Sequence, residues 1–178
     1  TALAITTAPT TGQSGLAVTP QPVVRLVDAN GNTVPTTGTL VTATLASGTG
    51  TLANATATTT SGVATFTGLS ITGTAGNYSF AFNAPSLAGV TTGLIPITAG
   101  TASRLAMVQQ PSASALNSVV FGQQPTVQVQ DASGNAVAGV ASVTATILTG
   151  GGALGGVATI NTSAAGLATF SGLSITGT

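Results

Sequence analysis

The chain has 178 residues, of which 43% are hydrophobic and 2% are charged, and its formal net charge is zero. Its only charged side chains are Arg25, Arg104, Asp28 and Asp131, and it contains no His, Lys, Glu or Cys. Two distant arginines cannot neutralise a phosphate backbone, the lack of Cys excludes disulfides, and no apolar run is long enough to insert into a membrane.

One heptapeptide divides the chain into repeats. Gly68–Thr74 returns unchanged as Gly172–Thr178. Self-similarity at a fixed period is typical of repeated structural units. The sequence therefore predicts a complete first domain at residues 1–102 and a second domain at 103–178, which stops before the equivalents of the first domain's last two strands.

Each repeat opens with a short apolar segment that a proline interrupts. The segments are Leu3–Ile5 and Leu105–Met107, and the prolines are Pro9 and Pro111. Proline cannot donate to a strand ladder and is tolerated at the edges of sheets. We therefore expect a split edge strand, whose second half lies around residues 16–18 in the first repeat.

The next strand is the best-matched one between the repeats. Pro22–Asp28 aligns with Pro125–Asp131, and in the second copy valines alternate with polar residues. Alternation at a period of two marks the inward face of a strand. It places four side chains in the predicted cores: Val24, Leu26, Val127 and Val129. Arg25 points outward on the same reasoning.

The strand ends in an Asp-x-x-Gly-Asn turn in both repeats, at residues 28–32 and 131–135. Glycine supplies positive φ there, and the aspartate can bond to local backbone. The spacing also resembles the start of a calcium loop, which makes Asp28, Asn30 and Asp131 candidate calcium ligands. Calcium takes six to eight oxygens, usually with several carboxylates, whereas each repeat offers one, so we favour the turn.

Three further strands are predicted, two of them in both repeats. The first spans 41–45 and 143–147, a weaker one lies within 55–60, and the third spans 62–66 and 166–170, with Phe66 and Phe170 facing inward. Leu69 and Ile71 have the opposite parity from Phe66, so a bulge or break at Gly68 would keep all three in the core. The repeated heptapeptide is therefore interpreted as a strand switch.

Only the first repeat continues beyond the heptapeptide. Residues 75–82 alternate, with Tyr78, Phe80 and Phe82 on one face, and residues 93–98 form a last strand whose Pro96 indicates an edge position. Short strands, frequent turn residues and the lack of a helical period predict an all-β fold, namely tandem antiparallel β-sandwiches.

The order of these motifs resembles the bacterial immunoglobulin-like (Ig-like) repeats of large surface proteins, of the invasin and intimin type. The resemblance rests on the Asp-x-x-Gly-Asn turn, the Gly-Val-Ala-Thr-Phe strand and the following Ala-Gly-x-Tyr, and it covers residues 1–102 and 103–178. It implies Ig-like domains at the cell surface, and places Tyr78 at a tyrosine corner whose hydroxyl bonds to nearby backbone. The Cys-Trp-Cys centre of antibody domains is missing.

Other motifs have simpler explanations than chemistry. Residues 150–155 match a dinucleotide-binding glycine pattern, but a strand follows them and no acidic residue lies beyond Asp131. No cofactor is therefore expected. Asn54, Asn77 and Asn161 lie in glycosylation sequons and are candidate sugar sites. Without His, Cys, Lys or Glu, a Ser or Thr nucleophile has no base, so we expect no enzymatic activity and no catalytic residues.

These features favour a structural stalk or fibre segment of an extracellular bacterial surface protein, whose partners are further Ig-like repeats. A first alternative is a self-assembling filament, a homopolymer of identical subunits in which a neighbouring chain completes the open second sandwich. Outward apolar residues such as Val23 and Val27 would then be contact points. A second alternative is a terminal adhesin, ranked last because aromatic and charged anchors are scarce outside the predicted core.

Overall fold

The computed structural model of the protein describes residues 1–139 and 141–177, and every regular element in these ranges is a β-strand. The chain forms two compact units, Thr1–Gly100 (unit 1) and Thr101–Thr178 (unit 2). The repeated heptapeptide thus falls once in each unit, although Thr178 itself lies outside the described residues. The protein is all-β, as the sequence predicts.

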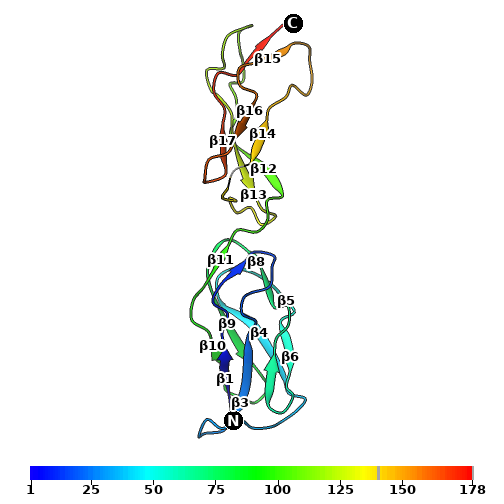
Figure 1. The fold of residues 1–178 in the computed structure, drawn as a ribbon, viewed down its shortest axis with the longest axis vertical. Helices are drawn as coiled ribbons and strands as arrows, with labels where there is room; N and C mark the ends of the chain where they lie inside the picture. Colours follow the sequence, from blue (N-terminus) through cyan, green and yellow to red (C-terminus); the bar gives the residue numbers. More distant parts are fainter. Residues whose placement is uncertain (140, 178) are drawn as a thin grey trace. The chain divides into compact units, whose positions relative to one another are not determined.

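Unit 1 is a β-sandwich of two main sheets and a two-stranded ribbon (Figure 1). One sheet has the order β1 (Ala2–Thr7), β3 (Val23–Val27), β7 (Val63–Thr65). The other has the order β2 (Gly12–Gln13), β11 (Ile95–Thr98), β9 (Gly76–Asn83), β4 (Leu40–Ser47), β6 (Thr56–Thr58), with β10 (Val90–Thr91) also paired to β9. The ribbon pairs β5 (Gly50–Ala53) with β8 (Ser70–Gly73). All of these pairs are antiparallel except β2 with β11.

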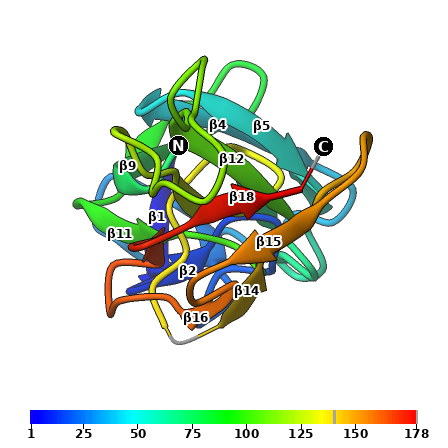
Figure 2. The same ribbon diagram turned by 90° about the horizontal axis from the view of Figure 1, so that it is seen from above.

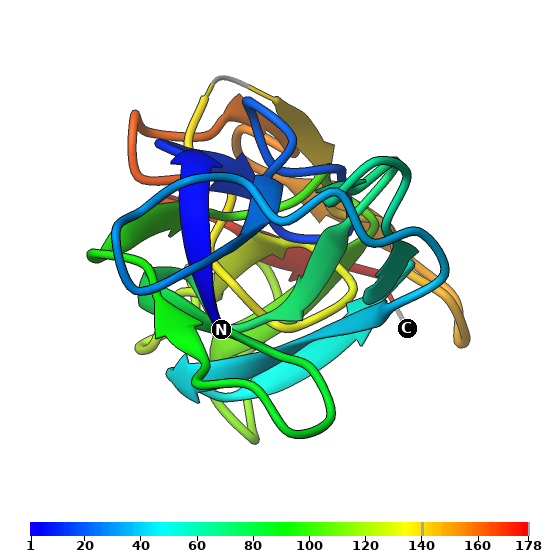
Figure 3. The ribbon, with the colours of Figure 1, turned by 90° about the horizontal axis from the view of Figure 1, so that it is seen from below.

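The core of unit 1 fills the space between the two sheets. Figure 3 shows the blue strand β1 of one layer and the cyan strand β4 of the other. Phe66, directly after β7, meets Phe82 of β9 across the interior, with ring centroids 5.1 Å apart and an interplanar angle of 54°. Tilted aromatic pairs of this kind add to the free energy gained by burying apolar area. Every predicted core residue of this unit is buried: Val24, Leu26, Phe66, Leu69, Ile71, Tyr78, Phe80 and Phe82.

The structure refines one expected strand position in unit 1 and corrects another. Around residues 16–18 the chain pairs with β8 through a bridge of Ala17 with Ser70, and a short strand, β2, precedes this segment at Gly12–Gln13. Leu16 is exposed whereas Val18 is buried. The strand that carries Pro96 is not at an edge, because β11 lies between β9 and β2. Its pairing with β2 involves only Ile97 and Thr98, so Pro96 lies beyond the end of that ladder, where its missing N–H costs nothing.

Val27 is also placed differently from the prediction. It is 8% exposed and therefore cannot serve as an outward contact point. Val27 is the last residue of β3, paired with Ala2 on one side, and the chain returning from the turn forms a bridge at Thr33 on the other. Alternation alone cannot predict this burial, because the covering segment comes from the turn.

Unit 2 repeats part of the strand pairing of unit 1. Its strands are β12 (Arg104–Gln109), β13 (Thr126–Gln130), β14 (Ser142–Thr144), β15 (Ala153–Gly155), β16 (Thr159–Asn161), β17 (Leu167–Thr169) and β18 (Ser174–Thr176). The sheet β12-β13-β17 corresponds to β1-β3-β7, the pair β14-β16 to β4-β6, and the pair β15-β18 to β5-β8. Figure 2 shows β15 beside β18. Val127, Val129 and Phe170 lie in its core.

Candidate functional site

The repeated heptapeptide switches the chain from one sheet to another. In unit 1, β7 pairs with β3, whereas β8 pairs with β5 in the separate ribbon. The change occurs at Gly68, whose φ is +70°, and at Gly172 of unit 2, whose φ is +71°. A glycine adopts this left-handed conformation without the steric cost that other residues carry. The predicted break at Gly68 is confirmed, and it lets Phe66, Leu69 and Ile71 all face the core.

A glutamine holds the strand switch in each unit. The Gln21 side-chain amide donates to the carbonyl oxygens of Val18 (2.6 Å) and Leu69 (3.2 Å), and its carbonyl accepts from the Leu69 N–H (2.8 Å). Gln124 makes the same three bonds in unit 2, to the carbonyls of Phe121 and Leu173 and from the Leu173 N–H. The side chain therefore satisfies backbone groups where the chain leaves one sheet for another.

Replacing Gln21 with alanine is expected to lower the free energy of unfolding of unit 1 by about 1–3 kcal/mol, because it strands the Leu69 N–H in a buried position. Urea unfolding followed by the fluorescence of Tyr78, the only Tyr in a chain without Trp, reports on unit 1 alone. The matched variant Gln124→Ala is the control, because it makes the same change in unit 2. An equal shift of the Tyr78 transition in both variants would contradict the local role of Gln21.

A buried threonine plays a similar part in both units. The Thr59 hydroxyl donates to the carbonyl of Thr36 at 2.8 Å and accepts from the Thr39 N–H at 3.0 Å. Thr162 repeats this arrangement, donating to the Gly139 carbonyl and accepting from the Ala141 N–H, both at 2.8 Å. Sequence reasoning missed both the glutamines and the threonines. The available signal was that each recurs in both repeats as a polar residue at an equivalent position.

Tyr78 closes the interior of unit 1. Its ring is buried, and its hydroxyl donates to the Thr74 carbonyl, four residues upstream, at 2.6 Å or to the Thr49 carbonyl at 2.8 Å. This is the tyrosine corner that the resemblance implies. The corner ties β9 to Thr74, the last residue of the heptapeptide, and to Thr49 just before β5, so it fixes how the aromatic strand enters the sandwich.

The aspartate turns lie at the ends of β3 and β13. Asp28 Oδ1 accepts from the backbone N–H groups of Asn30 and Asn32, and Oδ2 accepts from the Asn32 side-chain amide. Asp131 accepts the corresponding bonds from Asn135. Within residues 1–139 and 141–177, no three His, Cys, Asp or Glu side chains gather as a metal site. The carboxylates thus close their own turns, and calcium binding at Asp28, Asn30 and Asp131 stays a prediction.

These hydrogen bonds predict how unit 1 responds to acid. The side-chain amide of Asn32, and then its backbone N–H, lower the pKa of Asp28 below the ordinary value of 3.8. A carboxyl whose pKa is depressed on folding adds stability above its unfolded pKa and loses it as the pH falls through the folded pKa. The urea midpoint of unit 1 should therefore be constant near neutral pH and fall only below about pH 4.

Comparison with the variant Asp28→Asn tests whether Asp28 causes this loss of stability in acid. The variant lacks the titrating group, so the change in urea midpoint between pH 7 and pH 3, followed by Tyr78 fluorescence, is expected to be smaller than in the parent chain. An unchanged acid response in Asp28→Asn would show that another group is responsible. The exposed position of this turn in unit 1 keeps the expected difference modest.

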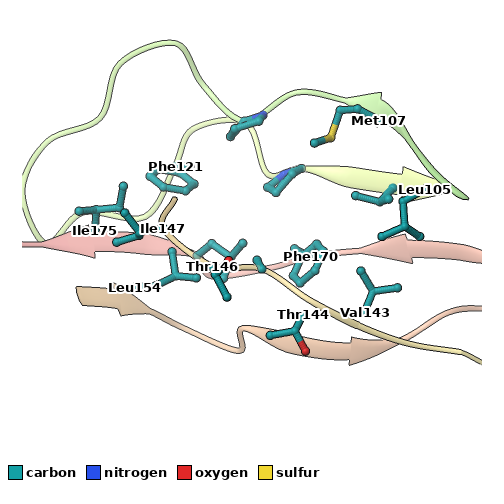
Figure 4. Close-up of a pocket in the computed structure, with 15 residues that line it drawn as sticks. Leu105, Met107, Phe121, Val143, Thr144, Thr146, Ile147, Leu154, Phe170 and Ile175 are labelled. Carbon is teal, nitrogen blue, oxygen red and sulfur yellow. The ribbon is translucent and has the colours of Figure 1, made fainter. Parts of the chain in front are cut away.

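Unit 2 contains an apolar groove. It has a volume of about 380 Å³ and is lined by side chains from both layers of the unit. Figure 4 shows Met107 above Phe170, Val143 to the lower right of Phe170 and Leu154 to its left, and all four line the groove. Leu105 is 57% exposed, whereas Leu3, which has the same register position in unit 1, is 5% exposed.

The remaining sequence motifs do not contribute to a site. The glycine-rich residues 150–152 form a bend before β15, and no helix follows. Asn54, Asn77 and Asn161 are exposed, so each is accessible to modification, and glycosylation stays a prediction. Within the described ranges, no helix is long and apolar enough to cross a membrane.

No protein-family model matches this chain, and no curated protein matches it either. Among solved structures, it is similar to the D0-D1 domain of intimin, with 19% identity and a TM-score of 0.37 over 97% of this chain and 84% of that one. It is also similar to domains 4-9 of the surface layer protein SbsC, with 18% identity and a TM-score of 0.35 over 97% of this chain, which spans 27% of that structure. At these values, the β-sandwich assignment rests on the chain's own strand pairing and cores.

Proposed function

We propose that the chain is a non-enzymatic stalk segment of an extracellular bacterial surface protein built from tandem Ig-like units. The observation that supports this most directly is the kind of residue that the two units share. The polar side chains that recur in both units all form hydrogen bonds to the backbone of their own unit. They are the pairs Gln21 and Gln124, Asp28 and Asp131, and Thr59 and Thr162. The polar residues that the two units share therefore stabilise the fold of each unit, which is what a spacer domain requires.

Strand directions support a role under tension. In unit 1 the early strand β2 and the last strand β11 run parallel, and the Ser14 N–H donates to the Thr98 carbonyl at 3.0 Å. Tension applied to the two ends of the unit pulls these strands in opposite directions along their axes. Their hydrogen bonds are then loaded together rather than one after another. Such a pairing resists extension better than one that opens from its end.

A self-assembling filament is the second candidate, and the apolar groove of unit 2 is the observation that favours it. A chain with zero net charge has little electrostatic repulsion to prevent such association. The adhesin alternative has less support, because recognition surfaces are usually anchored by exposed aromatic or charged residues, and the only Tyr is buried.

Sedimentation and electron microscopy of the purified 178-residue chain distinguish the stalk from the filament. The stalk proposal predicts monomeric particles over a wide range of protein concentration. Ordered polymers with a regular axial repeat would overturn it and favour the filament.

A further inference from the structure

We propose that the apolar groove of unit 2 is a binding site for one extended β-strand of the β9 type. The occupant is an uncharged polypeptide segment with a large apolar side chain at every second position, and it lies antiparallel to β14. This inference does not depend on the stalk role, because it follows from comparing the two units.

Unit 1 shows what fills the equivalent groove. The residues that line the groove in unit 2 include Leu105, Val127, Val143, Phe170 and Leu173. By strand pairing and sequence alignment, their equivalents in unit 1 are Leu3, Val24, Val41, Phe66 and Leu69, all of which are buried. They share one core with Tyr78, Phe80 and Phe82 of β9. The template for the occupant is thus present in the chain itself.

The edge of β14 carries the matching backbone groups. In unit 1, β4 lies between β6 and β9, with Ala43 opposite Phe82 and Leu45 opposite Phe80. In the described part of unit 2, β14 pairs only with β16. The Ala145 N–H donates to the Ala158 carbonyl, as the Ala43 N–H does to the Ala55 carbonyl. Because alternate residues of a strand bond to opposite sides, the backbone groups of Thr144 and Thr146 face the open edge.

The lengths of β4 and β14 agree with an open edge on β14. Strand β4 runs over eight residues, Leu40–Ser47, where it has a partner on each side. Strand β14 is regular over three residues, Ser142–Thr144. Residues 145–147 carry the same alternation as 43–45 but are not in a strand. An unpaired edge of this kind accepts another strand by main-chain hydrogen bonding, with side-chain pockets that set specificity.

A second hollow in unit 2 extends the site along β12. It has a volume of about 420 Å³ and is bordered by Arg104, Leu105 and Val129, among others. In unit 1 the loop after β9 covers the equivalent strand, because the Leu3 N–H donates to the Ala88 carbonyl at 2.9 Å and Leu87 packs on the core. We therefore expect the occupant to include the equivalent of that loop, which makes residues 75–91 the template.

The site can be tested by adding a synthetic peptide of residues 75–91 to the full 178-residue chain and measuring binding by calorimetry. We expect saturable binding of one peptide per chain and slower hydrogen exchange at the amides of Thr144 and Thr146. A peptide with Tyr78, Phe80 and Phe82 all replaced by Ser is the matched control, and it should bind about 100-fold more weakly or worse, since it lacks the three apolar anchors.

A substitution in the 178-residue chain tests the position of the site independently of the peptide control. Met107→Arg places a charge on an exposed lining residue of the groove and should weaken binding at least tenfold, about one unit in the logarithm of Kd. Leu94→Arg changes an exposed apolar residue of unit 1 and should leave binding unchanged. Absence of binding to the parent chain would overturn the proposal. So would stable association of the chain with itself that the peptide cannot displace, because the occupant would then be a second copy.

Discussion

Replacing Phe82 with alanine is expected to lower the free energy of unfolding of unit 1 by about 3–5 kcal/mol. The side chain is fully buried and meets Phe66 from the opposite sheet, so its removal leaves a cavity where the two layers join. Urea unfolding followed by Tyr78 fluorescence measures the change. A domain of this size is stable by only about 5–15 kcal/mol, so Phe82→Leu provides a milder version that keeps the unit folded.

The control for Phe82 is Leu94→Ala in the same unit. Leu94 is 67% exposed, so its truncation is expected to change stability by less than about 0.5 kcal/mol. If both variants had equal unfolding midpoints, the aromatic strand would not hold the sandwich together, and its role as the template for the groove of unit 2 would also be lost.

The second large effect is a difference between two equivalent substitutions. Leu3→Ala is expected to cost unit 1 about 2–5 kcal/mol, because Leu3 is buried beneath β9 and the loop that follows it. Leu105→Ala makes the same change in unit 2, where the side chain is 57% exposed, and is expected to cost about 1 kcal/mol or less.

Each of these two leucine variants needs its own probe. Tyr78 fluorescence follows unit 1, and amide hydrogen exchange of β13 follows unit 2, which contains no Tyr. Equal costs for the two leucines would mean that Leu105 is covered in solution, and the groove would then already be occupied. With the β9 peptide bound, the cost of Leu105→Ala should rise toward that of Leu3→Ala.

Parity of the apolar residues was enough to predict the strand switch. Phe66 and Leu69 can both face the core only if the chain changes register between them, and Gly68 is the residue that allows it. The resemblance to Ig-like repeats placed Tyr78 at its corner, where its hydroxyl bonds to the Thr74 and Thr49 carbonyls. These features depend on local pattern, which the sequence carries directly.

Features that depend on packing against distant segments could not be predicted in this way. Pro96 excludes a hydrogen bond at only one point of β11, so it did not rule out pairing with β2 further along the strand. Val27 is buried because a turn folds over it, which alternation does not reveal. Gln21 looks like an ordinary loop residue in the sequence, because Leu69, the residue of the strand switch to which it bonds, lies 48 residues further along the chain.

Single-molecule force extension of the full chain, held by its two ends, tests most directly whether the units carry load. Unfolding of the 100-residue unit Thr1–Gly100 should appear as a discrete force peak, and the released chain should span about 330–360 Å at 3.3–3.6 Å per residue, so the gain in length is this value less the end-to-end length of the folded unit. A peak of that length supports the stalk. Smooth extension without a peak would contradict it, because the strand pairing of unit 1 would then offer no resistance to tension.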